Sequence, residues 1–334
     1  MHILAQSQKF FQTKISPKIK RKHKKLFSFG FNALTLNPFI SLNSNARMIL
    51  AKRCTAETKI FRLVTNTNIL SYFPRIIKSL KLVKPQDRIN VDFSTFGGFQ
   101  VLTFAKQTFR GRAIPVYIAA ITYPIENPGS QTQFIIKEVK SFLKILGLSV
   151  HFVFDRGFEL PYLANSLADN HINFTIRMKK DKHIFYKGKD IPIRNLPWFE
   201  DDASVGIYGR KLRIVRSEKK KNMEEPWYLF TNDFIHTRDA IVAGYYFRFE
   251  IEETFRDLKH VFELNKFYKI QKKQTFLILL WFYILGFWIM WLLHSTKKYL
   301  QTRLTENTHK RLSVTKYFFE QIYLIKNLPY CLSP

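Results

Sequence analysis

The stretch "TQFIIKEVKSFLKILGLSVHFVFDRGFELPYLANSLADNHINFTIRM", residues 132–178, alternates helical and strand-like patterns and decides the fold class. Its first part has apolar residues at helical spacing and ends at Gly147, which predicts a helix over 132–147. Runs rich in β-branched and aromatic residues at 149–155 and 172–179 predict strands, with a second helix between them. Upstream, 87–96 and 113–124 have the same strand composition. Together these patterns predict an α/β fold with a mixed sheet flanked by helices.

The composition predicts a polyanionic partner. The 334 residues include 54 Lys+Arg against 25 Asp+Glu, a formal charge of +29. Nucleic acid is the favoured partner because neutralising phosphates releases counterions, and a membrane surface is the alternative. Cys54 and Cys331 have no paired spacing, so they support neither a disulfide framework nor a zinc site, and a reducing cytoplasmic setting is expected.

Four parts are expected along the chain. Residues 1–84 would form a basic N-terminal arm and a small helical DNA-binding region, and residues 1–56 carry eleven Lys or Arg but no acid. That arm could equally be a disordered tail, while a transit peptide would favour Arg and Ser. Residues 85–178 would begin the sheet domain and 179–232 would be a β-rich insertion. Residues 233–334 would hold a long helix, from about 236 to 262, and C-terminal helices.

An apolar segment at 276–293, "FLILLWFYILGFWIMWLL", allows two interpretations. Eighteen apolar residues are barely enough to span a bilayer, and a helix buried on all sides gives the same pattern. Lysines flank both ends and give no orientation, and no second span exists, so no membrane association is expected. The pattern alone leaves the choice open.

Five polar residues of the expected long helix fall within one 80° arc at 100° per residue. They are Tyr245, Arg248, Glu252, Arg256 and Lys259. Glu252 is therefore the candidate acid among cations, although an ordinary i±4 ion pair would give the same pattern.

Three other acids of that helix, Glu250, Glu253 and Asp257, are expected on its solvent side together with Tyr246. Residues 247, 251, 255 and 258 form a contiguous apolar stripe, which is expected to face the core.

Two further acids lie in or at the end of apolar strands. Asp92 interrupts "INVDF", and Asp155 follows the strand-like run in "VHFVFDRGF", where the strand gives way to a Gly turn. An unpaired buried carboxylate is costly, so a cation partner is expected, although a cap or a local ion pair would also satisfy each. Asp92, Asp155 and Glu252 brought together would suit Mg²⁺, which prefers oxygen ligands, and a pair of such ions assists phosphoryl transfer.

The spacing Tyr245, Arg248, Glu252, Lys259 resembles the Y-R-E-K signature of DDE-class insertion-sequence transposases, in the subgroup named after insertion sequence four. "VDFSTF" and "FDRGF" are similar to that family's two aspartate motifs, with Ser94 where Thr is common. The resemblance runs from about 85 to 262. It implies a ribonuclease H-like fold with a β-rich insertion.

The resemblance also implies an activity and its residues. Asp92, Asp155 and Glu252 would be both catalytic and metal-binding, holding two Mg²⁺ ions with Mn²⁺ able to substitute. The reaction would be endonuclease cleavage and strand transfer at the inverted-repeat ends of an insertion sequence. The enzyme would act on double-stranded DNA as a homodimer, in the cytoplasm and associated with the nucleoid.

DNA contacts are implied as well. Tyr245, Arg248 and Lys259 would bind the DNA backbone, with Arg256 on the same face. Trp227, in "EPWYLFTND", resembles a tryptophan that takes up a flipped base, although a strand Trp is often simply core.

Three alternatives stay open at this point. One is a transposase-derived DNA-binding protein that no longer cuts. Another is a membrane-associated basic protein, and the third is a ribonuclease H-like nuclease without strand transfer.

Overall fold

A computed structural model describes residues 72–96, 98–108, 111–122, 130–197, 202–218, 225–261 and 273–294. The chain forms two compact units. The first consists of Val83–Ser94 and Gln100–Glu253, and the described parts of Met1–Leu82, Thr95–Phe99 and Thr254–Pro334 belong to the second. The N-terminal basic arm lies outside the described residues.

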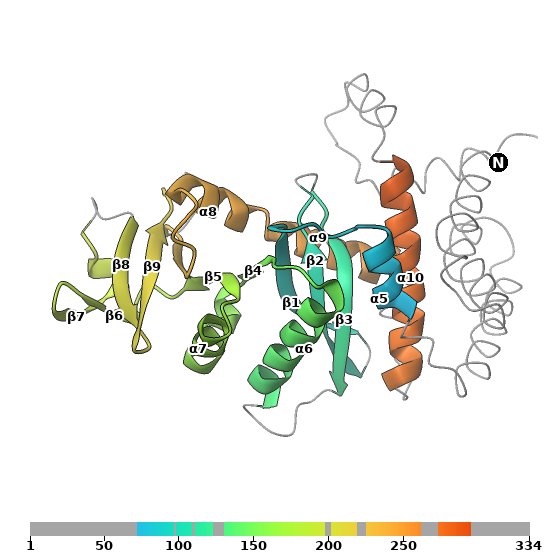
Figure 1. Ribbon diagram of the computed structural model, residues 1–334, viewed down its shortest axis with the longest axis horizontal. Coiled ribbons are helices and arrows are strands. Elements are labelled where there is room, and N and C mark those ends of the chain that lie inside the picture. The colour runs from blue at the N-terminus through green and yellow to red at the C-terminus, as the bar shows by residue number, and fades with distance from the viewer. Residues whose placement is uncertain are drawn as a thin grey trace, which may run out of the picture. The chain divides into compact units, whose positions relative to one another are not determined.

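The strands form one mixed sheet (Figure 1), with the order β3-β2-β1-β4-β5-β10-β9-β8-β6-β7. The pairs β1–β4 and β4–β5 are parallel, and from β5 through β10 to β7 the pairs are antiparallel. The bounds are β1 Arg88–Phe96, β2 Phe99–Lys106, β3 Ile114–Thr122, β4 His151–Phe154, β5 Asn173–Met178, β6 His183–Tyr186, β7 Lys189–Pro192, β8 Asp202–Ile207, β9 Arg210–Arg216 and β10 Tyr228–Thr231. The expected mixed α/β sheet is confirmed, and the order of β1 to β5 is consistent with a ribonuclease H-like fold.

Two helices of this unit, α6 (Ser130–Leu146) and α7 (Pro161–Asp169), lie side by side next to the strands (Figure 1). Both agree with the sequence prediction. Gly147 ends α6 with φ +66°, a conformation that glycine adopts without strain. Pro161 occupies the first position of α7, where its missing N–H costs nothing.

Aromatic contacts bind α6 to the strands. Phe104 meets Phe142 of α6 at 5.2 Å and Phe152 of β4 at 5.8 Å, both edge to face. Phe104 lies on β2, a strand that the sequence pattern did not predict. Nearly every residue of β2 is buried, so its sequence lacks the alternation that marks a strand with one wet face.

The prediction of one long helix over 236–262 is wrong, because the segment is divided into three elements. The structure has α8 (Arg238–Tyr246), α9 (Phe249–Arg256) and a π-helical turn, η7 (Asp257–Val261). The Thr237 side chain caps α8 by accepting from the N–H of Ala240. The apolar period continues across the break at 247–248, and periodicity alone therefore does not reveal it.

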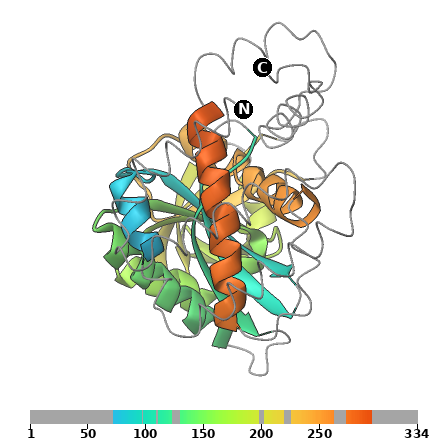
Figure 2. The ribbon, with the colours of Figure 1, turned by 90° about the vertical axis from the view of Figure 1, so that its right-hand side faces the viewer.

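In the second unit, α5 (Tyr72–Ser79) lies beside α10 (Lys273–His294), as Figures 1 and 2 show. Phe73 and Trp281 stack at 4.7 Å. Pro74 is accommodated within the helix, because it occupies the first turn of α5, where no intrahelical N–H bond is lost. Tyr283, Ile284 and Leu285 of α10 are fully buried. Across the described ranges, no helix meets the length and apolarity needed to cross a bilayer.

Candidate active site

Two of the predicted acids meet because β1 and β4 are parallel neighbours. Val91 of β1 is in register with Phe154 of β4, so the next residues, Asp92 and Asp155, emerge at the same place on the sheet. The buried strand residues before them fix this register, since a slip of one residue would turn every side chain to the other face. The two carboxylates therefore come together from positions 63 residues apart in the sequence.

Arg248 joins these acids to the third. Its guanidinium lies 3.6 Å from Asp92 Oδ2, 3.7 Å from Asp155 Oδ1 and 2.5 Å from Glu252 Oε1. The Arg248 side chain is only 4% exposed, so its charge is held by these carboxylates rather than by water. All three predicted acids thus surround one buried cation.

Tyr245 holds one of the acids in place. Its hydroxyl donates a 3.0 Å hydrogen bond to Asp155 Oδ1, and its ring is fully buried. Burial raises the pKa of this hydroxyl, so it stays protonated and able to donate. Tyr245 and Arg248 were predicted to bind the DNA backbone. In this structure both side chains are buried and contact carboxylates.

Burial shifts the pKa values of the charged groups in the site. Burial raises the pKa of Asp92 to about 6, against the Arg248 guanidinium and the backbone N–H of Phe93, which lower it. Burial alone would lower the pKa of Arg248, but Tyr245 and the surrounding carboxylates raise it overall. Perturbed carboxyl groups of this kind are typical of functional sites.

Two acids predicted to face solvent, Glu250 and Asp257, are instead buried. Glu250 is 4% exposed and accepts hydrogen bonds of 2.8 Å from the N–H groups of Thr108 and Gly111. The prediction for Glu250 was wrong because the break before α9 rotates its first turn away from the arrangement of a continuous helix. Glu253 is partly buried and pairs with Arg112 at 3.1 Å. These contacts fasten α9 to the chain between β2 and β3.

Three of the four apolar-stripe residues predicted on this segment are buried: Ile251, Phe255 and Leu258. The basic residues after Glu253 belong to the second unit. Lys259 places Nζ 5.4 Å from the ring centre of Phe96, and Arg256 is exposed.

Two polar residues that were not predicted as part of the site lie on β1, on the same face as Asp92. Arg88, Asn90 and Asp92 alternate with the buried Ile89 and Val91. The Arg88 guanidinium donates to the carbonyl of Ala240, and the Asn90 amide donates to the carbonyls of Phe247 and Arg248. The signal was in the sequence, since polar residues at every second position of a strand share one face.

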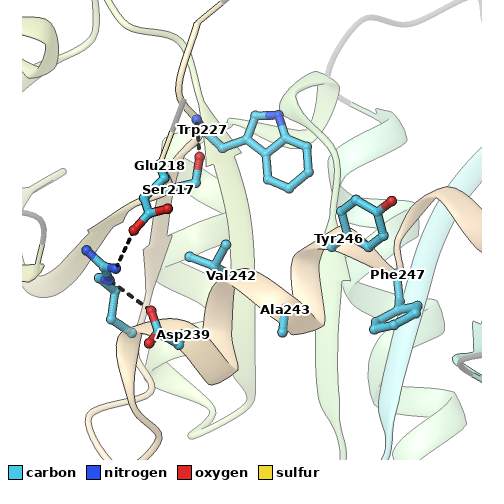
Figure 3. A pocket seen from close by; sticks show the side chains of 9 residues that line it. Ser217, Glu218, Trp227, Asp239, Val242, Ala243, Tyr246 and Phe247 are labelled. Carbon is cyan, nitrogen blue, oxygen red and sulfur yellow. Dashed lines mark hydrogen bonds and ion pairs between the residues drawn. The ribbon is translucent and has the colours of Figure 1, made fainter. Parts of the chain in front are cut away.

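Trp227 lies in the hydrophobic core, packed edge to face on Tyr245 with ring centres 5.1 Å apart. It also lines a cavity of about 440 Å³, shown in Figure 3, whose other walls include Val242, Tyr246 and Phe247. The backbone N–H of Trp227 donates to Ser217 Oγ, which fixes the start of β10. A role in packing and a role in binding a planar ligand are therefore both compatible with its position.

The donor set fits a divalent cation in its chemistry. Three carboxylates supply the hard oxygen ligands that Mg²⁺ prefers, and they already surround a positive group. Their spacing is set by the guanidinium, however. Within the described part of the chain, no group of three or more His, Cys, Asp or Glu residues has the spacing to hold a metal ion.

Comparison with known proteins gives one family match. Residues 132–285 match the family model described as "Transposase DDE domain". That range contains Asp155, Trp227 and Glu252, and Asp92 precedes it. No curated protein matches the chain.

Among solved structures, the cryo-EM structure of a piggyBac transposase synaptic complex with hairpin DNA matches 96% of this chain and 85% of its own. The identity is 11% and the TM-score 0.41, too low to decide the fold or the function. It is the family match over 132–285 that supports a DDE-type transposase.

Proposed function

We propose that this chain is a transposase of the insertion sequence four group, which cleaves DNA and transfers strands at the inverted-repeat ends of an insertion sequence. The observation that carries the proposal is the meeting of Asp92, Asp155 and Glu252 around Arg248. The family match over 132–285 supports the same class of reaction. The Y-R-E-K spacing supports the subgroup.

Asp92, Asp155 and Glu252 would hold the Mg²⁺ ions that this chemistry needs, with Mn²⁺ as a substitute. When bound, such ions activate the attacking oxygen and stabilise the departing one. Tyr245 orients Asp155 through its hydroxyl, and Arg248 offsets the mutual repulsion of the acids before DNA and metal arrive. In the DNA-bound enzyme Arg248 would contact a DNA phosphate.

The cavity beside Trp227 would receive a nucleobase. The rings of Trp227, Tyr246 and Phe247 are among its lining side chains and supply flat surfaces for stacking (Figure 3). The partner would be double-stranded DNA bound by a homodimer, in the cytoplasm and near the nucleoid. The net charge of +29 supports a nucleic-acid partner.

The test uses the full chain and a plasmid that carries its reading frame with the flanking genomic DNA. We expect Mg²⁺-dependent nicking at the flanks and joining to a second plasmid, with nicking reduced at least ~10²-fold in Asp92→Ala, Asp155→Ala and Glu252→Ala. Asp190→Ala is the control, since Asp190 forms an exposed pair with His183 on the β6–β7 hairpin. Nicking that survives all three substitutions would refute the assignment. Nicking without joining would identify a nuclease.

A DNA-binding protein that no longer cuts is the second candidate. The observation in its favour is that the three carboxylates are spaced around a guanidinium rather than at the spacing of a metal site. It predicts DNA binding without nicking in either Mg²⁺ or Mn²⁺.

A further inference from the structure

The break between α8 and α9 is held by two buried side-chain amides from neighbouring strands. Asn90 of β1 donates from Nδ2 to the carbonyl of Phe247 at 3.1 Å and to that of Arg248 at 3.4 Å. Gln107, which follows β2, donates from Nε2 to the carbonyl of Gly244 and to Asn90 Oδ1, each at 2.7 Å. Asn90 and Gln107 are both buried. We refer to these two residues as the amide pair.

The amide pair replaces a helical hydrogen bond. In an uninterrupted helix the N–H of Arg248 would bond to the carbonyl of Gly244, four residues earlier. Here it bonds to the carbonyl of Tyr245 at 2.9 Å, and Gln107 supplies a donor for Gly244. A buried carbonyl without a donor is costly. The break therefore depends on the Asn90 and Gln107 amides, which donate to backbone carbonyls at the break. A continuous helix would supply backbone N–H donors for these carbonyls and would not need the amides.

The location of the break determines where the acidic site forms. Arg248 is the residue at the break, and Glu252 lies one turn into α9. Asn90 is two residues before Asp92 on the same face of β1, about 7 Å along the strand. One face of β1 thus supplies both the Asp92 carboxylate and the Asn90 amide, which donates to the backbone at the α8–α9 break.

We propose that Asn90 and Gln107 are positioning residues, which hold the α8–α9 break so that Arg248 and Glu252 face Asp92 and Asp155. The catalytic part of this inference rests on the proposed function. Neither amide touches the reacting atoms. Their effect is on geometry, and a displacement of about 1 Å in a reacting group costs on the order of 10²-fold in rate.

The experiment compares Asn90→Leu and Gln107→Met with the wild-type full chain. Both substitutions keep the approximate size of the side chain and remove its donor. Tyr117→Phe is the matched control, because it deletes the hydrogen bond from Tyr117 to Glu138, between β3 and α6, without touching the break. Hydrogen exchange of the backbone amides at 248–253 is measured together with nicking of the plasmid described above.

We expect exchange at 248–253 to rise at least tenfold in both variants and to stay at the wild-type rate in Tyr117→Phe. The maximal nicking rate should fall ~10²-fold while the DNA concentration for half-maximal rate changes less than twofold. A purely structural role would raise exchange across the whole sheet unit instead. If Asn90→Leu fails to fold, Gln107→Met decides, since it disrupts the same pair from the residue after β2.

Folded variants with wild-type exchange at 248–253, or with an unchanged maximal rate, would overturn the proposal. A wild-type chain that does not nick would instead refute the proposed function. The exchange measurement would still decide whether the amide pair holds the break.

Discussion

Arg248 is a buried cation whose main effect is to offset the repulsion among three carboxylates. Arg248→Gln is expected to lower the free energy of unfolding by ~1–3 kcal/mol in the absence of divalent ions, because it leaves three partly exposed carboxylates to repel one another without a cation. Millimolar Mg²⁺ should then stabilise the variant more than the wild type. Denaturant unfolding with and without Mg²⁺ measures both effects. Equal stabilisation by Mg²⁺ would contradict a cation site among these acids.

Glu250 and Glu253 form a matched pair of acids on the same helix. Glu250→Ala removes the acceptor of two backbone N–H groups in a buried position and is expected to cost ~2–3 kcal/mol of unfolding free energy. Glu253→Ala loses a partly exposed ion pair with Arg112 and is expected to cost no more than ~1 kcal/mol. Urea unfolding gives both values. The reverse order would show that α9 is not fastened through Glu250.

Within α8, Gly244 is a glycine that helix propensity alone would replace. Alanine at an exposed helical position usually stabilises by ~1 kcal/mol over glycine. Here a Cβ would overlap the Arg88 guanidinium, which donates to the carbonyl of Ala240 in the same helix. Gly244→Ala is therefore expected to destabilise by ~1–3 kcal/mol. In the Arg88→Ala background the same change should be neutral or stabilising, and a double-mutant cycle of unfolding free energies checks this.

The start of β4 carries a buried histidine between two elements. His151 accepts or donates at 2.8 Å with Thr175 of β5 and lies 3.6 Å from Asp233, which precedes α8. Burial, with Arg88 nearby, lowers the pKa of His151 to about 4. Between pH 6.5 and about 4, His151 is protonated in the unfolded chain but stays neutral in the folded one. The free energy of unfolding therefore falls as the pH falls.

This loss is expected to reach ~2–3 kcal/mol by pH 4 and to be absent in His151→Gln. The measurement is denaturant unfolding at pH 7 and pH 4.5. His183→Gln changes an exposed histidine on β6 and serves as the control. A wild-type and a His151→Gln profile of equal slope would contradict a neutral buried imidazole.

For the whole molecule, the charge of +29 makes salt the main variable of DNA binding. If at least six phosphates are neutralised, affinity for random-sequence duplex should fall about 10³-fold or more between 50 and 200 mM salt. Filter binding over that range gives the slope. Salt-independent binding would exclude phosphate contacts as the source of affinity.

The strand and helix positions of the sheet unit could be predicted because an element that is buried on one face has apolar residues at a regular spacing in the sequence. The helix 132–147, the strands around Asp92 and Asp155, and the strand 172–179 were all recognisable in this way. Strand β2 was not, since burial on both faces removes the period. The break before α9 was not, because its cause lies in side chains more than 130 residues away in sequence, at Asn90 and Gln107.

The sequence by itself determined the α/β class, the basic character and the residue types of the candidate site, since these follow from periodicity, charge and spacing along the chain. Only the tertiary structure decided that Arg248 lies among Asp92, Asp155 and Glu252 and that Glu250 is buried. The physical reason is that strand register and a broken helix bring distant residues together, and both depend on contacts that no local pattern contains.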